Sequence, residues 1–144
     1  MTTEHVVDLS ANPFIPDGYT VDTHSRGDSF TWDPSAIEFY LSEPQRVDDV
    51  IEGNHLIKEL EDKPVLNANI LDYLLARSYL IPEEWKKDEK GRARYIFFWG
   101  TIYRDSDGRR SVRGLYWDGS KWDWSSNPLD RWWNITNPAA LLAH

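Results

Sequence analysis

Two tight-turn sequences divide the stretch from Arg94 to Trp124 into three runs rich in aromatic and β-branched residues. The turns are Asp105–Gly108 (DSDG) and Asp118–Gly119 (DG), in which glycine supplies the positive φ that a hairpin needs and aspartate tolerates it. Such runs and turns predict a three-stranded antiparallel meander. Six of the eight tryptophans lie between Trp99 and Trp133, so we expect the rest of the chain to pack around this sheet.

The register of the two turns determines which side chains share a face of the meander. We place Arg104 opposite Arg109 and Trp117 opposite Ser120, and side chains then alternate between the two faces. One face carries Ile96, Phe98, Ile102, Leu115, Trp117, Trp122 and Trp124. The other carries Tyr95, Phe97, Trp99, Thr101, Val112, Tyr116, Lys121 and Asp123. In this register Gly114 lies opposite Trp99, where bare backbone leaves room for a large ring.

Both faces of the meander are therefore rich in rings, and two explanations remain open. In the first, the helices cover one face, and the N-terminal strands or a partner subunit cover the other. In the second, one face stays partly open as an aromatic binding surface. The first is favoured because most aromatic residues of a small domain lie in its core.

Helices and further strands are expected before the meander. The helices are His55–Asp62 and Ala68–Arg77, and Asn67 is the expected N-cap of the second. The strands are Tyr19–His24, Ser29–Trp32, Ile37–Leu41 and Val50-Ile51, of which the last is expected to pair back onto Ile37–Leu41.

Three segments carry no such pattern: we expect an irregular segment over residues 1–18, an exposed charged loop over 86–91 and a last helical turn within 137–144. The sequence thus predicts a single α+β domain over residues 1–144. Its antiparallel sheet is centred on a Trp- and Arg-rich meander at residues 92–133, with two short helices packed on it.

The composition narrows the class of protein. A chain of 144 residues is the size of one domain. It has no cysteine, which excludes disulfides, a thiol nucleophile and Cys-ligated zinc. The first residues lack the basic and apolar regions of a secretory signal, and no apolar run approaches a membrane span, so we expect a cytoplasmic protein that does not enter membranes.

The charge is unevenly distributed along the chain. Residues 92–133 contain eight Lys and Arg against five Asp and Glu, a net of +3, whereas residues 1–91 carry a net of −11. The whole chain has a net charge of −8. An acidic chain repels nucleic acid at long range, but a local basic face could still bind it.

No catalytic, metal or cofactor signature is present. The chain lacks a Gly-rich phosphate loop, a nucleophile elbow and a zinc-binding HExxH motif, and its four histidines, His5, His24, His55 and His144, are far apart. The DSDG turn lacks the glutamate that would complete a calcium loop, because Gly114 stands in that position. We therefore assign no catalytic residue, no metal and no cofactor, and favour a non-enzymatic protein while leaving enzymatic activity open.

What remains is a surface suited to binding, because Arg, Trp and Tyr are enriched where proteins contact one another. Its candidate residues are Tyr103, Arg104, Arg109, Arg110, Arg113, Tyr116, Trp117, Trp122, Trp124, Trp132 and Trp133. A protein partner or self-association is the first hypothesis. Binding of a nucleotide or single-stranded nucleic acid is the alternative, because rings stack bases and arginines neutralise phosphates. Carbohydrate binding is the third.

Several segments also carry a resemblance, among them NPFIPDGYTV, KELEDKPVLNANILDYLLA, LIPEEWK, FFWGTIYRDSDG, VRGLYWDGSKWDW and NPAALLA. In this order they resemble a family of small bacterial proteins described only as hypothetical. The similarity extends from Asn12 to Ala143. It implies a single domain containing the Trp-rich meander, and it implies no activity and no site residue.

Overall fold

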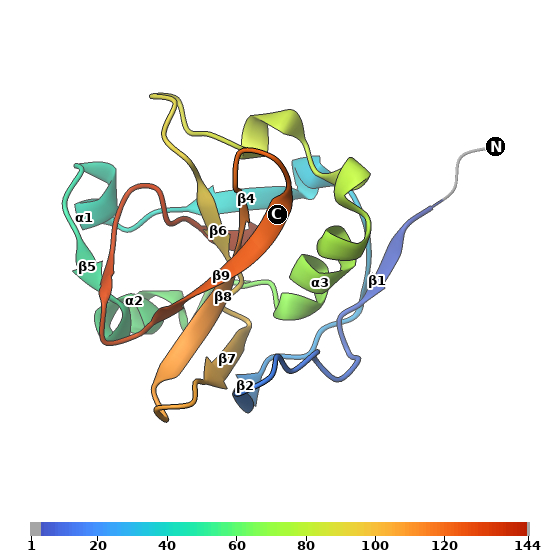
Figure 1. The fold of residues 1–144 in the computed structure, drawn as a ribbon, viewed down its shortest axis with the longest axis horizontal. Helices are drawn as coiled ribbons and strands as arrows, with labels where there is room; N and C mark the ends of the chain where they lie inside the picture. The colour runs from blue at the N-terminus through green and yellow to red at the C-terminus, as the bar shows by residue number, and fades with distance from the viewer. Residues whose placement is uncertain (1–3, 144) are drawn as a thin grey trace.

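The predicted meander lies at the centre of a seven-stranded curled sheet in the computed structural model, which describes residues 4–143 (Figure 1). Its strands are β6 (Tyr95–Phe97), β7 (Thr101–Arg104), β8 (Arg110–Trp117) and β9 (Trp122–Pro128). β9 pairs along one side of β8, and β7 and β6 pair with successive halves of its other side. The meander is therefore confirmed, with its first strand broken in two.

Both turns are longer than expected, so the predicted registers were wrong. Arg104 lies opposite Arg110 rather than Arg109, because the Asp105 carboxylate accepts the Arg109 N–H and holds residue 109 within the turn. Trp117 lies opposite Trp122 rather than Ser120. Here Asp118 donates its own N–H to the Lys121 carbonyl, which closes a four-residue turn.

The break between β6 and β7 lies at Gly100 and changes which side chains share a face. A Cβ on Gly100 would lie 2.7 Å from the backbone nitrogen of Asn67, so only glycine allows this approach. Beyond the break the alternation resumes out of phase: Ile102 packs on the opposite face from Ile96, and Thr101 bonds the N–H of Ala68. The other expected face assignments of the large apolar residues hold.

Gly114 accommodates a ring as predicted, but the ring belongs to Phe97 rather than to Trp99. A Cβ at Gly114 would lie 2.9 Å from two carbon atoms of the Phe97 ring. If the pairing of Tyr103 with Ser111 continued without a break, Gly100 would lie opposite Gly114. The break instead brings Phe97 there, three residues earlier in the chain.

The remaining strands extend this sheet and form two small ones. β2 (Thr20–His24) pairs with β7, while β11 (Ala139–Leu142) lies between β6, to which it is parallel, and β4 (Ile37–Tyr40). β1 (Val6–Asp8) pairs with β3 (Ser29–Thr31), and β5 (Ile51–Glu52) pairs with β10 (Trp132–Trp133).

Three expectations for these segments were wrong. Residues 1–18 are not wholly irregular, because β1 lies within them. Of this segment, residues 1–3 are outside the residues that the structure describes. Val50-Ile51 does not pair back onto β4, because β5 pairs with β10. The segment after Asn137 forms β11 rather than a helical turn, because Ala139–Leu142 completes the sheet between β6 and β4; His144 is outside the described residues.

Helices cover both faces of the sheet, so the protein has two hydrophobic clusters, one on each face (Figure 1). α3 (Ala68–Ala76) packs on the face of Ile96 and Leu115, and α2 (Gly53–Leu60) packs on the face of Phe97 and Val112. Asn67 caps α3 as predicted. This supports the covered-face explanation, with one helix on each face rather than both on one.

Short helical elements complete the fold: α1 (Glu43–Arg46) and single 3-10 turns at Pro34–Ala36, Ser78–Leu80 and Glu83–Trp85. The result is an α+β domain, as predicted. None of the helices within residues 4–143 has the length and apolar character needed to cross a membrane.

Candidate functional site

Three of the eleven predicted binding residues are buried. Tyr103 and Trp133 are 0% exposed and Arg113 is 1% exposed. Trp133 packs its ring against Phe97 and Trp99, with ring centroids 4.5 and 4.7 Å apart. These three side chains therefore belong to the interior in this structure and do not form part of its surface.

Arg113 is the centre of a buried polar network. Its two terminal nitrogens each lie 2.9 Å from an oxygen of Asp72 on α3, and its guanidinium lies 4.4 Å from the centroid of the Trp124 ring. Burial alone would lower the pKa of Arg113, but the hydrogen bonds to Asp72 and its charge outweigh burial and raise this pKa. For Tyr103, by contrast, burial itself raises the pKa, and its hydroxyl donates to the Phe14 carbonyl at 2.8 Å. This arginine ties α3 to the sheet.

Four ring residues lie half-buried at one end of the meander. Trp117 and Trp122 contact each other edge to face at 5.6 Å, and the Lys86 ammonium lies 3.8 Å from the centroid of Trp117. Tyr116 stacks on Tyr95 at 4.8 Å. The fourth is Trp124, already described against Arg113. The sheet brings these four predicted residues together, and each already has a neighbour within the chain.

The other three arginines of the predicted set lie at the opposite end of the meander. Arg104, Arg109 and Arg110 line a hollow of about 170 Å³ beside Asn54 of α2. Arg104 pairs with Asp22 at 3.0 Å and Arg109 with Asp105 at 3.2 Å, whereas Arg110 bonds the Asn54 side chain. Two of the three charges are thus already balanced by carboxylates.

Trp132 is 64% exposed and is not among the residues that line the hollow. Successive residues of a strand point to opposite sides, so the burial of Trp133 turns Trp132 outward from β10. The eleven predicted residues therefore do not form one surface: three are buried, four rings lie at one end of the meander, three arginines lie at the other end, and Trp132 points outward from β10.

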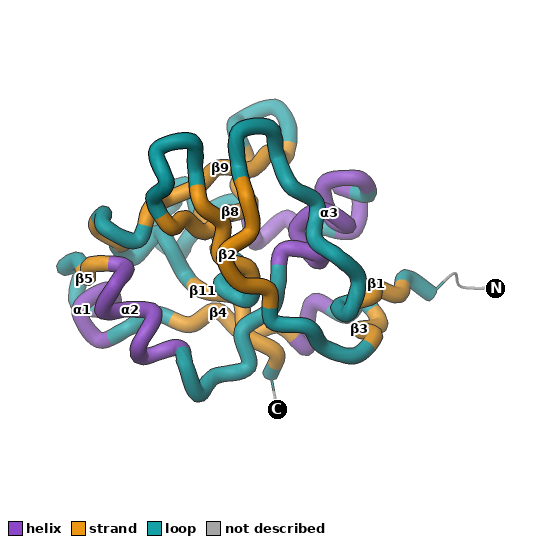
Figure 2. The backbone as a smooth tube through the Cα atoms, turned by 90° about the horizontal axis from the view of Figure 1, so that it is seen from below, coloured by secondary structure: helices purple, strands orange, loops and turns teal. Residues whose placement is uncertain are grey.

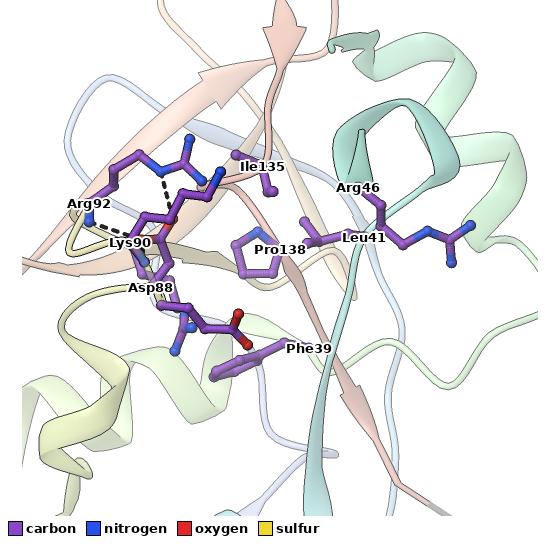
Figure 3. A pocket seen from close by; sticks show the side chains of 10 residues that line it. Phe39, Leu41, Arg46, Asp88, Lys90, Arg92, Ile135 and Pro138 are labelled. Carbon is purple, nitrogen blue, oxygen red and sulfur yellow. Dashed lines mark hydrogen bonds and ion pairs between the residues drawn. The ribbon is translucent and has the colours of Figure 1, made fainter. Parts of the chain in front are cut away.

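A pocket that the sequence did not reveal lies beyond β4, and we call it the basic pocket (Figure 3). Its volume is about 240 Å³. The apolar residues that line it are Phe39, Leu41, Ile135 and Pro138. Its charged residues are Arg46, Asp88, Glu89, Lys90, Arg92 and Arg94. Four cations against two carboxylates make this lining net positive, in a chain whose net charge is −8.

One wall of the basic pocket is held in place by the buried side chain of Gln45. Its Nε2 donates to the carbonyls of Asn134 and Asn137 at 2.8 and 3.1 Å, and its Oε1 accepts the Ser42 N–H. This amide fixes α1, which carries Arg46, to the loop that carries Ile135. In Figure 3 Arg46 and Arg92 lie at opposite ends of the pocket.

The other wall is the hairpin of residues 86–94, closed by a bridge between Lys87 and Ala93. Asp88 accepts the N–H groups of Lys90 and Arg92 and the Nε–H of Arg92, each at 2.9 Å. Burial favours the neutral carboxyl, but these hydrogen bonds outweigh it and lower the pKa of Asp88. Gly91 has a φ of +78°, as the turn requires.

The sequence did contain a signal for the hairpin of residues 86–94. Asp88-Glu-Lys-Gly-Arg92 and Asp105-Ser-Asp-Gly-Arg109 share the pattern D-x-x-G-R. In both turns the aspartate accepts the arginine N–H and its Nε–H. Comparing the two segments would have identified residues 86–94 as a structured hairpin rather than a charged loop. The apolar lining gave no such signal, because its residues are far apart in sequence.

The described part of the chain contains no cluster of three or more His, Asp or Glu side chains placed to hold a metal ion. His24 belongs to a structural network, since its Nδ1 lies 2.8 Å from the Thr101 hydroxyl. His5 contacts the Tyr73 hydroxyl at 3.1 Å.

The site that the geometry offers is the basic pocket, which has a small apolar lining and a cationic rim. The groups around it are suited to binding.

The chain was compared with protein families, curated proteins and solved structures, and nothing in any of the three comparisons matches it. The resemblance to a family of small bacterial proteins therefore stays a prediction.

Proposed function

We propose that this protein is a non-enzymatic binding protein and that it contacts a partner protein through the basic pocket. The observation that carries the proposal is the combination of an apolar lining with Arg46, Lys90, Arg92 and Arg94 around it. Apolar contacts supply affinity at protein interfaces, and surrounding charges supply specificity and speed of association.

The pocket's size supports a protein partner over a cofactor. Its volume of about 240 Å³ lies below the roughly 300–1,000 Å³ typical of small-molecule sites. A pocket of this size suits one or two side chains of a larger partner. The half-buried rings of Trp117 and Trp122 contact each other, and Trp117 lies beside Lys86, at the base of the same hairpin that lines the pocket. They extend the surface available to that partner.

The test is affinity capture with the full chain from extracts of its own cells, followed by identification of the bound proteins. Ile135→Glu places a charge in the apolar lining, and Tyr79→Glu is the matched control at an exposed ring outside the pocket. We expect a partner retained by the unchanged chain and by Tyr79→Glu but lost from Ile135→Glu, when both variants melt like the unchanged chain. Identical capture by both variants would refute the role of the pocket.

One observation favours nucleotide or single-stranded nucleic-acid binding as the second candidate: three arginines converge on the hollow beside Asn54. Such binding would weaken steeply with salt and with Arg110→Gln, which removes the guanidinium of the hollow that has no carboxylate within 4 Å among residues 4–143. Binding of a labelled oligonucleotide that does not respond to either change would exclude this mode.

A further inference from the structure

The sheet has three edge strands, β2, β4 and β9, and two of them carry features that hinder pairing with another chain. β9 ends in Pro128, which has no N–H, and the Asp123 carboxylate accepts the Trp124 N–H on its outer side. β2 is interrupted by a register shift between Val21 and Thr23, and bulges of this kind twist an edge away from a regular partner.

The third edge, β4, is regular and has a strand neighbour on one side only among residues 4–143 (Figure 2). Phe39 lies opposite Ala140, whose carbonyl turns away from β4 to accept the Leu66 N–H at 3.1 Å. Opposed residues of an antiparallel ladder either bond each other or both turn away. The N–H and C=O of Phe39 therefore point outward, at the free edge of the sheet.

Phe39 joins this edge to the basic pocket. Its backbone faces the free edge, and its side chain lines the pocket together with Leu41, two residues further along the same face. A strand added beside β4 would place alternate side chains next to these two, while the side chains between them would face the other side of the sheet.

Charge then indicates which strand would fit. Arg46, Lys90 and Arg94 have no carboxylate within 4 Å among the described residues, whereas Arg92 is shared by Asp88 and Asp48. Arg94 lies over the Phe39 ring at 5.1 Å and donates to the Glu84 carbonyl, which holds its guanidinium beside the apolar lining. Glu89 lines the pocket as well and opposes an acidic ligand, but the cations outnumber the carboxylates.

Resting on the proposed function, we propose that the partner contributes an extended acidic segment, in which carboxylates stand two residues to either side of an apolar residue, and that this segment pairs with the free edge of β4. The apolar side chain enters the basic pocket against Phe39 and Leu41. The two carboxylates point to the same side of the segment and meet Lys90 and Arg94. Main-chain hydrogen bonds supply affinity in this mode of recognition, and pockets for alternate side chains supply specificity.

The test begins with a random-peptide phage library selected on the immobilised full chain. We expect the selected peptides to carry Asp or Glu two residues to either side of an apolar residue. Lys90→Glu should weaken their binding about fivefold or more, since it turns an attractive contact into a repulsive one. Lys58→Glu, the same change at an exposed lysine of α2 outside the pocket, should leave binding unchanged. Selection of basic or uncharged peptides, or equal weakening by both variants, would overturn the acidic segment.

Amide hydrogen exchange of the complex with a selected peptide tests the strand pairing. The Phe39 N–H should exchange at least about tenfold more slowly when the peptide is bound, because it acquires an acceptor. The Tyr40 N–H already faces β11 and serves as the internal control. If the peptide shifts the resonances of Ile135 but leaves exchange at Phe39 unchanged, strand pairing is wrong and the proposed function stands. If no selected peptide perturbs Ile135, both fall.

Discussion

Removing the carboxylate of Asp72 should destabilise the fold strongly, because it leaves Arg113 buried without a counter-charge. Arg113 is 1% exposed, and both of its terminal nitrogens depend on Asp72. Breaking a buried pair from one side costs about 3–5 kcal/mol. The Asp72 side chain is 26% exposed, so water could partly replace its carboxylate, and we take the lower end of that range. Alanine favours a helix over aspartate by roughly 0.5 kcal/mol, which leaves a cost of about 2.5 kcal/mol for Asp72→Ala.

The double variant Asp72→Ala/Arg113→Met provides the matched control. It removes both charges and fills the site with an unbranched apolar side chain among the rings of Phe14, Tyr103 and Trp124. It also removes the Arg113 Nε–H, which is buried and has no hydrogen-bond partner among residues 4–143. Replacing a buried ion pair by apolar residues is often neutral, so we expect the double variant to lie within about 1 kcal/mol of the unchanged chain.

Urea unfolding followed by far-ultraviolet circular dichroism measures both free energies. Tryptophan fluorescence is less suitable, because Trp124 lies against Arg113 and would report the local change. Unfolding of Asp72→Ala at the same urea concentration as the unchanged chain would show that Arg113 does not depend on Asp72 for its stability in the interior. A double variant no more stable than Asp72→Ala alone would show that the cost does not come from an unpaired buried charge.

Three further predictions concern the sheet, a histidine and the hairpin. Gly114→Ala should cost about 1–3 kcal/mol in urea unfolding, because its Cβ would meet the Phe97 ring at 2.9 Å, whereas Gly27→Ala, with 3.4 Å to Leu9, should be nearly neutral. Burial lowers the pKa of His24 below the value of about 6.5 in the unfolded chain. The neutral His24 therefore contributes its full stability above that pH, and this stability is lost as the pH falls through the lower pKa of the folded state. Urea midpoints measured between about pH 7.5 and 5 should show the decline. The variant His24→Gln should show a smaller decline over the same range. Asp88→Asn should speed amide exchange at Arg92 without affecting Arg109, which has its own aspartate; equal exchange in variant and unchanged chain would contradict the role of Asp88.

Sequence patterns predicted the local elements better than their pairing. The meander and the Asn67-capped helix follow from turn residues and hydrophobic spacing, which act within a few residues. The register depended on turn hydrogen bonds made by the Asp105 and Asp118 side chains, which composition does not reveal. The break at Gly100 arises from contact with Asn67, a residue on a different element, so only the folded chain shows why glycine is there.

The candidate site was less predictable than the fold. Arg113 looks like any arginine of a basic strand, and only its position opposite Asp72 on α3 assigns it to the interior. The basic pocket draws on β4, α1, the 86–94 hairpin and the loop before β11, none of which marks a site by itself. Residue types therefore led to the hypothesis of a binding protein, while the site proposed for it is formed by contacts between residues distant in sequence.

The position of β11 between β4 and β6 has a consequence for how the chain folds. Its partners in β4 precede it by about one hundred residues, from Tyr40 opposite Ala139 to Ile37 opposite Leu142. Contacts between such distant segments require closure of a long loop, and proteins rich in them fold slowly. The meander, whose hairpins are local, can form early, while β4 must wait for β11 before it has a partner. Until then β4 exposes both edges, so the folding chain is open to wrong pairing at the strand where we propose that the folded chain binds.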